Sequence, residues 1–149
     1  MHRRSYNVVR LAVYLFLKKG RSILLIRRFN TGYMDGWYTT VAGHIEKDET
    51  AVKTAIREAR EEVGIRILEK DLKLAHIQHR YRRAPGDSDY VDFHFIATRW
   101  RGEPRNMEPN KCDDIGWFDI GRLPKKTLPY ILLILKRIKE GRFYSEYGF

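Results

Sequence analysis

The segment from Asp48 to Gly64 constrains the fold of this chain more than any other. Its apolar residues recur at helical spacing, Asp48 is a residue type that commonly caps the start of a helix, and Gly64 is the type that most often follows the last turn. The segment therefore predicts an α-helix over 48–63 with one apolar face. Three glutamates fall within two turns of this helix: Glu58, Glu61 and Glu62. This concentration of acid is unusual in a chain where Lys and Arg outnumber Asp and Glu by 29 to 19.

The three carboxylates border the apolar face of the predicted helix. At about 100° per residue, Glu61 and Glu62 lie about 60° and 40° to either side of Glu58. The apolar face begins beside Glu62 and consists of Val52, Ala55, Ile56, Ala59 and Val63. Glutamates at this spacing repel each other by a few tenths of a kcal/mol, and partial burial raises their pKa values. A bound divalent cation removes both costs, because carboxylate oxygens are the ligands that a hard ion such as Mg²⁺ prefers.

A solvated acidic helix is the alternative interpretation. Arg57 could pair with Glu61, and Glu62 with Arg66, at spacings that stabilise an exposed helix face. The residues around the helix decide between the two interpretations, because they extend the acidic cluster into a longer pattern.

The wider segment, GHIEKDETAVKTAIREAREEVGI over 43–65, resembles the signature of the Nudix hydrolases. That signature is a glycine, five residues, a glutamate, seven residues, Arg-Glu, an aliphatic position, any residue, Glu-Glu, any residue, a glycine and an aliphatic position. The matching residues here are Gly43, Glu49, Arg57, Glu58, Ala59, Glu61, Glu62, Gly64 and Ile65. The departures are mild. Ala59 stands where a larger aliphatic residue is frequent, and Ala42 where some members have a second glycine.

The resemblance implies an α/β (α+β) fold, namely a Nudix-type α/β/α sandwich with a central mixed sheet, formed by a single Nudix domain over 1–149. The hydrophobic pattern agrees, because strands are predicted on both sides of the central helix and a second helix follows them. The predicted strands are 8–17, 22–29, 37–41, 73–81, 90–100 and 113–120. The second helix is predicted at 129–139, started by Pro129 and ended by Gly141.

The resemblance also implies roles for the signature residues. Glu58 and Glu62 would be the principal ligands of Mg²⁺ or Mn²⁺, and Glu61 would share a metal or act as the general base. Gly43 would permit the turn that brings the backbone against the metal. Arg57 would orient Glu49 and the helix through a charge-assisted pair. The implied catalytic group is therefore Glu58, Glu61 and Arg57, and the implied metal group is Gly43, Glu58, Glu61 and Glu62.

The implied reaction is metal-assisted hydrolysis of a diphosphate linkage. The leading prediction is a MutT-like enzyme that converts a nucleoside triphosphate into a nucleoside monophosphate and pyrophosphate. Dinucleoside polyphosphates, ADP-ribose and nucleotide sugars are alternative substrates. A different class of function is a non-catalytic Nudix module that senses nucleotides or binds RNA. Such modules typically lose one of the metal-binding glutamates, and all three are present here.

Candidate substrate-binding residues lie mainly outside the signature. Arg27 and Arg28 end a predicted strand, where alternation sends one to each face, and they either reach a phosphate or remain exposed. Trp37 either stacks on a base or packs in the core. His44, beside the signature glycine, could touch a metal-bound phosphate. Tyr81 lies 16 residues after the signature, near where Nudix enzymes that act on dinucleoside polyphosphates carry a tyrosine.

Other segments add weaker candidates. The acidic residues before and at the start of the last predicted strand, Glu108, Asp113 and Asp114, could supply a base or a nucleobase contact. Three strand histidines, His76, His79 and His94, show no zinc spacing and are predicted to be structural. The aromatic tail FYSEYGF either folds over the site or mediates self-association.

The composition sets the remaining expectations. A net charge of +10 and a pI near 9.8 favour a polyanionic partner. We expect a nucleotide or a nucleotide derivative; nucleic acid is a weaker alternative, because the basic residues are spread along the chain without a repeated aromatic platform. The single cysteine, Cys112, cannot form an internal disulfide, and no apolar run is long enough to span a membrane. These features predict a cytoplasmic monomer or homodimer with no membrane partner.

Overall fold

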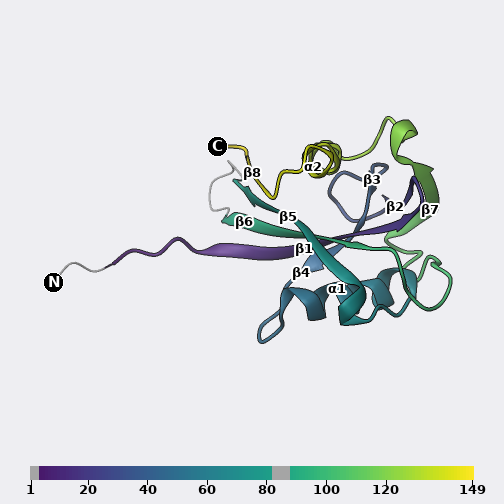
Figure 1. Ribbon diagram of the computed structural model, residues 1–149, viewed down its shortest axis with the longest axis horizontal. Coiled ribbons are helices and arrows are strands. Elements are labelled where there is room, and N and C mark those ends of the chain that lie inside the picture. The colour runs from purple at the N-terminus through teal and green to yellow at the C-terminus, as the bar shows by residue number, and fades with distance from the viewer. Residues whose placement is uncertain (1–3, 82–87) are drawn as a thin grey trace.

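The computed structural model describes residues 4–81 and 88–149. Within these residues eight strands form one mixed sheet, with helix α1 (Ala51–Val63) on one face and helix α2 (Pro129–Lys139) on the other (Figure 1). The predicted α/β/α sandwich with a central mixed sheet is confirmed. Among the described residues, no helix has the length and apolar character needed to cross a membrane.

The strands follow the predicted positions with shifts of a few residues at their ends. They are β1 (Val9–Lys19), β2 (Ser22–Arg28), β3 (Tyr38–Thr39), β4 (Val41–His44), β5 (Leu72–Arg80), β6 (Asp89–Ala97), β7 (Cys112–Asp119) and β8 (Tyr144–Tyr147). Short 3₁₀ helices at Glu69–Asp71 and Ile120–Arg122 precede β5 and follow β7. The strand predicted at 37–41 is two strands, because β3 pairs with β2 whereas β4 pairs with β1; Thr40 lies between them, and its hydroxyl donates to the carbonyl of Leu15.

Strand β1 is central to the sheet and positions the signature glycine. It runs parallel to β6 along its length and pairs with two different strands on its other edge. The antiparallel partner of Ala12–Leu15 is β4, whereas that of Lys18–Lys19 is β2. The order of the sheet is β3-β2-β1-β6-β5-β8, with β4 on β1 and β7 on β2. Gly43 of β4 therefore lies opposite Val13 of β1, on the edge that faces α1.

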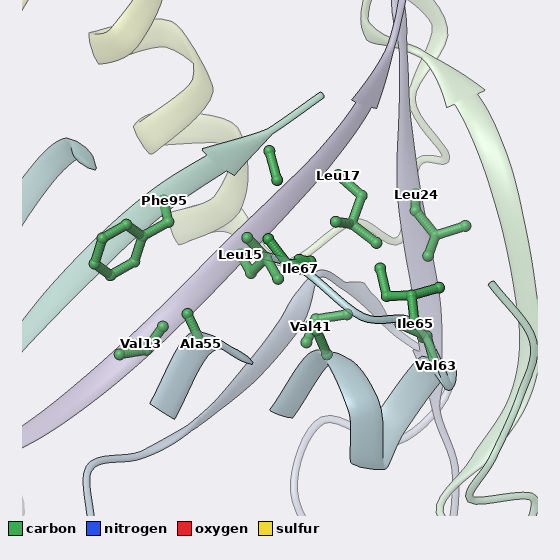
Figure 2. Close-up of a cluster of buried hydrophobic side chains, with 12 residues drawn as sticks. Val13, Leu15, Leu17, Leu24, Val41, Ala55, Val63, Ile65, Ile67 and Phe95 are labelled. Atoms are coloured by element: carbon green, nitrogen blue, oxygen red, sulfur yellow. The ribbon is translucent and has the colours of Figure 1, made fainter. Parts of the chain in front are cut away.

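Small residues allow α1 to pack closely on the sheet. Ala55, Ala59 and Val63 are completely buried and contact aliphatic side chains from several strands (Figure 2). Leu15 and Leu17 of β1 are also completely buried in this cluster. Each such large aliphatic side chain stabilises the fold by about 1.5–3 kcal/mol relative to leaving it in water. The packing of this cluster thus sets the distance between α1 and the sheet.

The predicted N-cap of this helix is wrong by two residues. Asp48 has a φ of 65° and belongs to the turn before the helix, so it cannot cap the first turn. Thr50 is the cap, and its hydroxyl accepts a hydrogen bond from the N–H of Lys53 at 3.2 Å. Gly64 ends the helix as predicted, with a φ of 71° that glycine adopts without strain.

The opposite face of the sheet buries polar residues beneath α2. Ile131 and Ile134 of α2 pack there on apolar residues of β1 and β2. Asp92 and His94 of β6 are almost completely buried, although the alternating pattern of this strand is typical of one with a solvated face. The ring of His94 stacks on that of Tyr14 with 5.0 Å between centroids. His94 is therefore structural, as its sequence context predicted.

The aromatic tail forms a strand that the sequence did not predict. Strand β8 pairs in parallel with β5 at the outer edge of the sheet (Figure 1). Ser145 anchors it, with its hydroxyl 2.7 Å from Nε2 of His76. Phe149 stacks on Tyr81 with 5.5 Å between centroids. The tail extends the sheet rather than folding over the signature residues.

The buried His94 predicts a pH dependence of stability. Burial, with a smaller contribution from His76, lowers the pKa of His94 from 6.5 to about 3. The folded state keeps the imidazole neutral, whereas the unfolded chain protonates it below pH 6.5. The free energy of unfolding should therefore fall by about 1.4 kcal/mol per pH unit from this group as the pH falls from 6.5 toward 3. The free energy of unfolding of His94→Leu, measured by urea denaturation at several pH values in this range, should change with pH by that much less than it does in the wild type. An equal change with pH in the two proteins would refute this assignment.

Candidate active site

A cavity of about 540 Å³, which we call the α1 cavity, opens between α1, the strands β2 to β4 and the loop before β7. Both signs of charge line it. The acidic residues are Glu46, Glu58, Glu62 and Glu108. The basic residues are Arg27, Arg28 and Lys111. Carboxylates beside cations suit a ligand that combines a metal ion with phosphate groups.

Arg57 joins the signature glutamates into one network. Its Nε and Nη2 donate to the two oxygens of Glu49 at 2.8 and 2.9 Å, which forms the charge-assisted pair that the resemblance implied. Its Nη1 donates to Glu58 at 2.8 Å and to Glu61 at 3.2 Å. Nη2 also donates to the carbonyl of His44 at 3.2 Å. The guanidinium therefore ties α1 to the loop that precedes it.

The pair between Arg57 and Glu49 stays ionised. The hydrogen bonds from Arg57 hold the pKa of Glu49 at about 2, with a smaller contribution from the Thr54 hydroxyl. In return, the hydrogen bond to Glu49 raises the pKa of Arg57. Both groups thus keep their charges at neutral pH.

Glu58 and Glu62 lie deeper and show the opposite shift. Burial raises the pKa of Glu58, although Arg57 opposes the effect. Burial also raises the pKa of Glu62 well above its ordinary value, and the neighbouring Glu58 raises it further. Glu62 accepts a hydrogen bond from the N–H of Ala42 at 3.3 Å. Two carboxylates are therefore held together in a partly buried position where their ionised forms require a cation.

Gly43 brings the backbone of β4 against Glu58. A Cβ atom at this position would overlap the side chain of Glu58 from Cγ to Oε1. A glycine is required here because any side chain would displace that carboxylate. Gly43 lies within strand β4 rather than in a turn, so the expected turn is wrong; what the glycine permits is the close approach of the backbone to Glu58.

The donor set of the α1 cavity fits a hard divalent cation. Glu58, Glu62 and Glu108 line one cavity, and the pKa values of the first two are raised mainly by burial and further by repulsion from neighbouring glutamates; a bound cation offsets both effects. Within 4–81 and 88–149 no three His, Cys, Asp or Glu side chains converge as a formed metal centre. An oxygen of Glu58 points to Arg57 and one of Glu62 points to Ala42.

Of the three acidic candidates near β7, Glu108 lines the α1 cavity and the other two do not. Asp113 pairs with Arg27 at 2.7 Å, and Asp114 accepts a hydrogen bond from the hydroxyl of Tyr38. The carbonyl of Glu108 accepts from the N–H groups of Lys111 and Cys112, both at 2.9 Å, so a tight turn fixes its position. Sequence reasoning could name the group of acids but could not choose among them.

The predicted substrate-binding residues separate into two groups. Arg27, Arg28 and His44 line the α1 cavity. Strict alternation would have sent the two arginines to opposite faces, but an irregularity in the pairing of β2 with β7 falls between them. Trp37 packs in the core beneath α2, and Tyr81 lies at the far edge of the sheet. Neither of these aromatic residues lines the cavity.

Several lining residues were missed by sequence reasoning. Lys111 is 64% exposed and lies 3.9 Å from Glu108, on the rim of the cavity. Polar residues complete the lining: Asn30, Thr31, Thr39 and Thr40. They come from loops and very short strands, whose positions no periodic pattern predicts.

A second cavity of about 260 Å³, which we call the tyrosine cavity, adjoins the first. The two cavities share Arg28, Ala42, Gly43 and His44. The remaining wall of the tyrosine cavity includes Tyr14, Tyr33, Tyr90, Tyr130 and Arg80. The guanidinium of Arg80 lies 4.3 Å from the ring centroid of Tyr90 and pairs with the buried Asp92 at 2.8 Å. Such a wall suits a planar ring.

Comparison with known proteins connects this geometry to a family. The sequence matches the family described as NUDIX domain over residues 6–135. The chain belongs to the Nudix family. The resemblance inferred from the signature is therefore confirmed, and the match extends from before β1 into α2.

Named relatives of this Nudix chain are hydrolases. It is 32% identical over 118 residues to the NAD-capped RNA hydrolase NudC of Chromobacterium violaceum, over 79% of this chain and 41% of that protein. The chain thus spans about two-fifths of the length of the curated relatives that it matches. Its fold matches the crystal structure of a MutT NUDIX hydrolase from Burkholderia pseudomallei with a TM-score of 0.78 and 25% identity, over 87% of this chain and 98% of that one.

A further structure shows the same fold. A NUDIX hydrolase from Nitrosomonas europaea matches with a TM-score of 0.74 and 21% identity, over 92% of this chain and 93% of that one. Together with the family match, these structures show that the chain has the Nudix fold.

The packing at Gly43 predicts a specific loss of turnover. In Gly43→Ala the new methyl group must displace the carboxylate of Glu58, and a misplacement of about 1 Å can cost about 100-fold in rate. Steady-state kinetics should show a kcat lower by about that factor while the circular dichroism spectrum stays unchanged. Gly116→Ala is the matched control, since its Cβ would meet a Phe118 ring atom at 3.2 Å outside the cavity. Equal kcat values for the two variants would contradict the proposed role of Gly43.

Proposed function

We propose that the protein is a Mg²⁺-dependent pyrophosphohydrolase that converts a nucleoside triphosphate into a nucleoside monophosphate and pyrophosphate. The observation that carries this proposal is the pair of partly buried carboxylates, Glu58 and Glu62, in one cavity with Arg27 and Arg28. Hydrolysis of a polyphosphate needs carboxylates that bind a metal ion and, beside them, basic side chains that bind phosphate.

Three carboxylates would hold the metal. Glu58 and Glu62 would be the main ligands, and Glu108, from the loop before β7, would complete the set. When bound, Mg²⁺ polarises the phosphoryl oxygens and makes water a stronger nucleophile at neutral pH. Glu61 is 47% exposed and bonded to Arg57, so its proposed role is to accept a proton near the rim or to join a second metal.

The cations of the α1 cavity would bind the phosphate chain. Arg28 donates from Nε to the carbonyl of Tyr33 at 2.6 Å and from Nη2 to the hydroxyl of Thr31 at 2.9 Å, which holds its guanidinium at the cavity wall. Arg27 is held by Asp113 at 2.7 Å. Lys111 adds a mobile charge at the rim. Pre-positioned guanidinium groups favour phosphate binding because little conformational entropy is lost.

The tyrosine cavity would hold the base of the substrate. It adjoins the α1 cavity at Gly43 and His44, so a nucleotide could extend from one cavity into the other. Its lining includes Tyr33, Tyr90 and Tyr130, and aromatic side chains of this kind would suit a purine or pyrimidine.

Pyrophosphate cleavage in an NAD-type dinucleotide, free or at the end of an RNA, is a second candidate function. The observation that favours it is the 32% identity to a protein named NAD-capped RNA hydrolase. The net charge of +10 would also attract an RNA chain. The same three carboxylates would act in this reaction, so the two candidates differ only in the substrate.

A substrate panel with glutamine variants tests this proposal. Purified protein is incubated with Mg²⁺ and with nucleoside triphosphates, dinucleoside polyphosphates, ADP-ribose, NAD and NAD-capped RNA, and the products are separated by chromatography. We expect turnover of nucleoside triphosphates with release of pyrophosphate. Glu58→Gln should lower kcat by at least about 100-fold, because even residues that only support a metal ligand contribute 10- to 100-fold.

The matched control is Glu69→Gln in the exposed 3₁₀ helix before β5, which should retain wild-type kcat. Full turnover by Glu58→Gln and Glu62→Gln would refute a metal-dependent reaction in the α1 cavity. Turnover of NAD or NAD-capped RNA alone would select the second candidate. Nucleotide binding without turnover of any substrate would favour a sensing module.

A further inference from the structure

A second surface of the molecule combines an apolar groove with basic walls. The groove has a volume of about 660 Å³ and lies between α2 and the turn that joins β1 to β2. Its apolar lining, which we call the floor, is supplied mainly by Ile96, Leu132, Leu135 and Ile138, since the adjoining Phe16 and Ile23 are only 1% exposed. Leu132 is 41% exposed, although it is a large aliphatic residue. A concave apolar surface of this size is typical of a binding site.

The cations of the groove come from both of its walls. Lys18 and Arg21 stand on the β1–β2 side, and Lys136 and Lys139 stand on the α2 side. Arg21 makes a weak ion pair with Asp119 at 3.6 Å, with both side chains largely exposed. In the part of the chain that the structure describes, the three lysines take part in no ion pair. Their charges are thus available to a ligand.

The groove is separate from the proposed catalytic site. Its lining shares no residue with the α1 cavity or with the tyrosine cavity. The α1 cavity includes residues of α1, whereas the groove lies beside α2. The tyrosine cavity is lined by Tyr130 of α2, but it too has no lining residue in common with the groove. An occupant of the groove therefore need not contact the residues that line either cavity.

We propose that this groove binds an amphipathic helix of a partner protein that carries acidic residues on both sides of its apolar stripe. Apolar side chains of such a helix, spaced at i, i+3, i+4 and i+7, would fill the floor of the groove. Its flanking carboxylates would meet Lys18 and Arg21 on one side and Lys136 and Lys139 on the other.

Other occupants match the groove less well. A fatty acid carries one charge at one end, whereas the cations here stand on both walls. A polynucleotide would use the cations but not an aliphatic floor, because bases stack on aromatic rings. A bilayer surface would require apolar side chains that protrude, and this surface is concave. The amphipathic helix uses both the floor and the two basic walls.

The test is a direct binding measurement with a defined probe. The probe is a synthetic 18-residue helical peptide with a leucine stripe flanked by glutamates, labelled with fluorescein, and binding is followed by fluorescence anisotropy at about 150 mM salt. We expect saturable binding at one site. Two matched peptides, one with serine in place of each leucine and one with lysine in place of each glutamate, should bind at least 10-fold more weakly.

Variants of the protein test whether the peptide binds in the groove. Leu132→Ser and the double variant Lys136→Glu/Lys139→Glu should each weaken binding at least 10-fold. The controls are Leu68→Ser, at a residue that is 49% exposed outside the groove, and Lys47→Glu/Lys53→Glu near α1. Both controls should bind as the wild type does. All four variants alter exposed side chains, and circular dichroism checks that they fold.

Three results would overturn the proposal. The first is the absence of saturable binding to the leucine–glutamate peptide. The second is equal binding of the serine peptide, which would indicate attraction by charge alone. The third is unchanged affinity in both groove variants. Binding of oleate or of phosphatidylserine vesicles without binding of the peptide would likewise overturn it and would assign the groove to a lipid.

Discussion

The bidentate pair between Arg57 and Glu49 is the interaction on which the rest of the site depends. Two parallel hydrogen bonds at 2.8 and 2.9 Å hold the guanidinium, and the pair lowers the pKa of Glu49 to about 2. Because the guanidinium is fixed, its remaining N–H groups can orient Glu58 and Glu61 on successive turns of α1. Lysine could not replace it, since a single ammonium lacks the planar fork that reaches several carboxylates at once.

The sheet positions the strands that carry Gly43 and Arg28 beside these carboxylates. Strand β1 pairs first with β4 and then with β2, so the two strands that carry Gly43 and Arg28 diverge from a common neighbour. The α1 cavity lies between them and is closed by α1. Small residues of α1 let the helix approach until Glu58 fills the space above Gly43. The carboxylates are thereby held in a position that would be unfavourable without a cation.

The sequence predicted what periodic patterns and the fixed spacing of the signature can encode. Both helices follow from hydrophobic periodicity, whereas the α/β/α sandwich and the Arg57–Glu49 pair were implied by the resemblance to the Nudix signature. Glu108 and Lys111 could not be assigned, because a loop brings them to the cavity from more than forty positions after Glu62. The irregularity between Arg27 and Arg28 arises where β2 pairs with β7, and the sequence of β2 alone does not predict which strand pairs with it. The Asp48 cap was wrong because the left-handed backbone of Asp48 places it in the turn before the helix, and Thr50 caps the first turn instead.

The central claim is that Glu58 and Glu62 are held together in order to bind a divalent cation. Electron paramagnetic resonance of Mn²⁺ measures this binding directly and does not depend on the substrate. We expect the signal of free Mn²⁺ to disappear on titration with wild-type protein, and Glu62→Gln to weaken this binding at least 10-fold while Glu69→Gln leaves it unchanged. Equal Mn²⁺ affinity in all three proteins would show that Glu62 does not hold the cation.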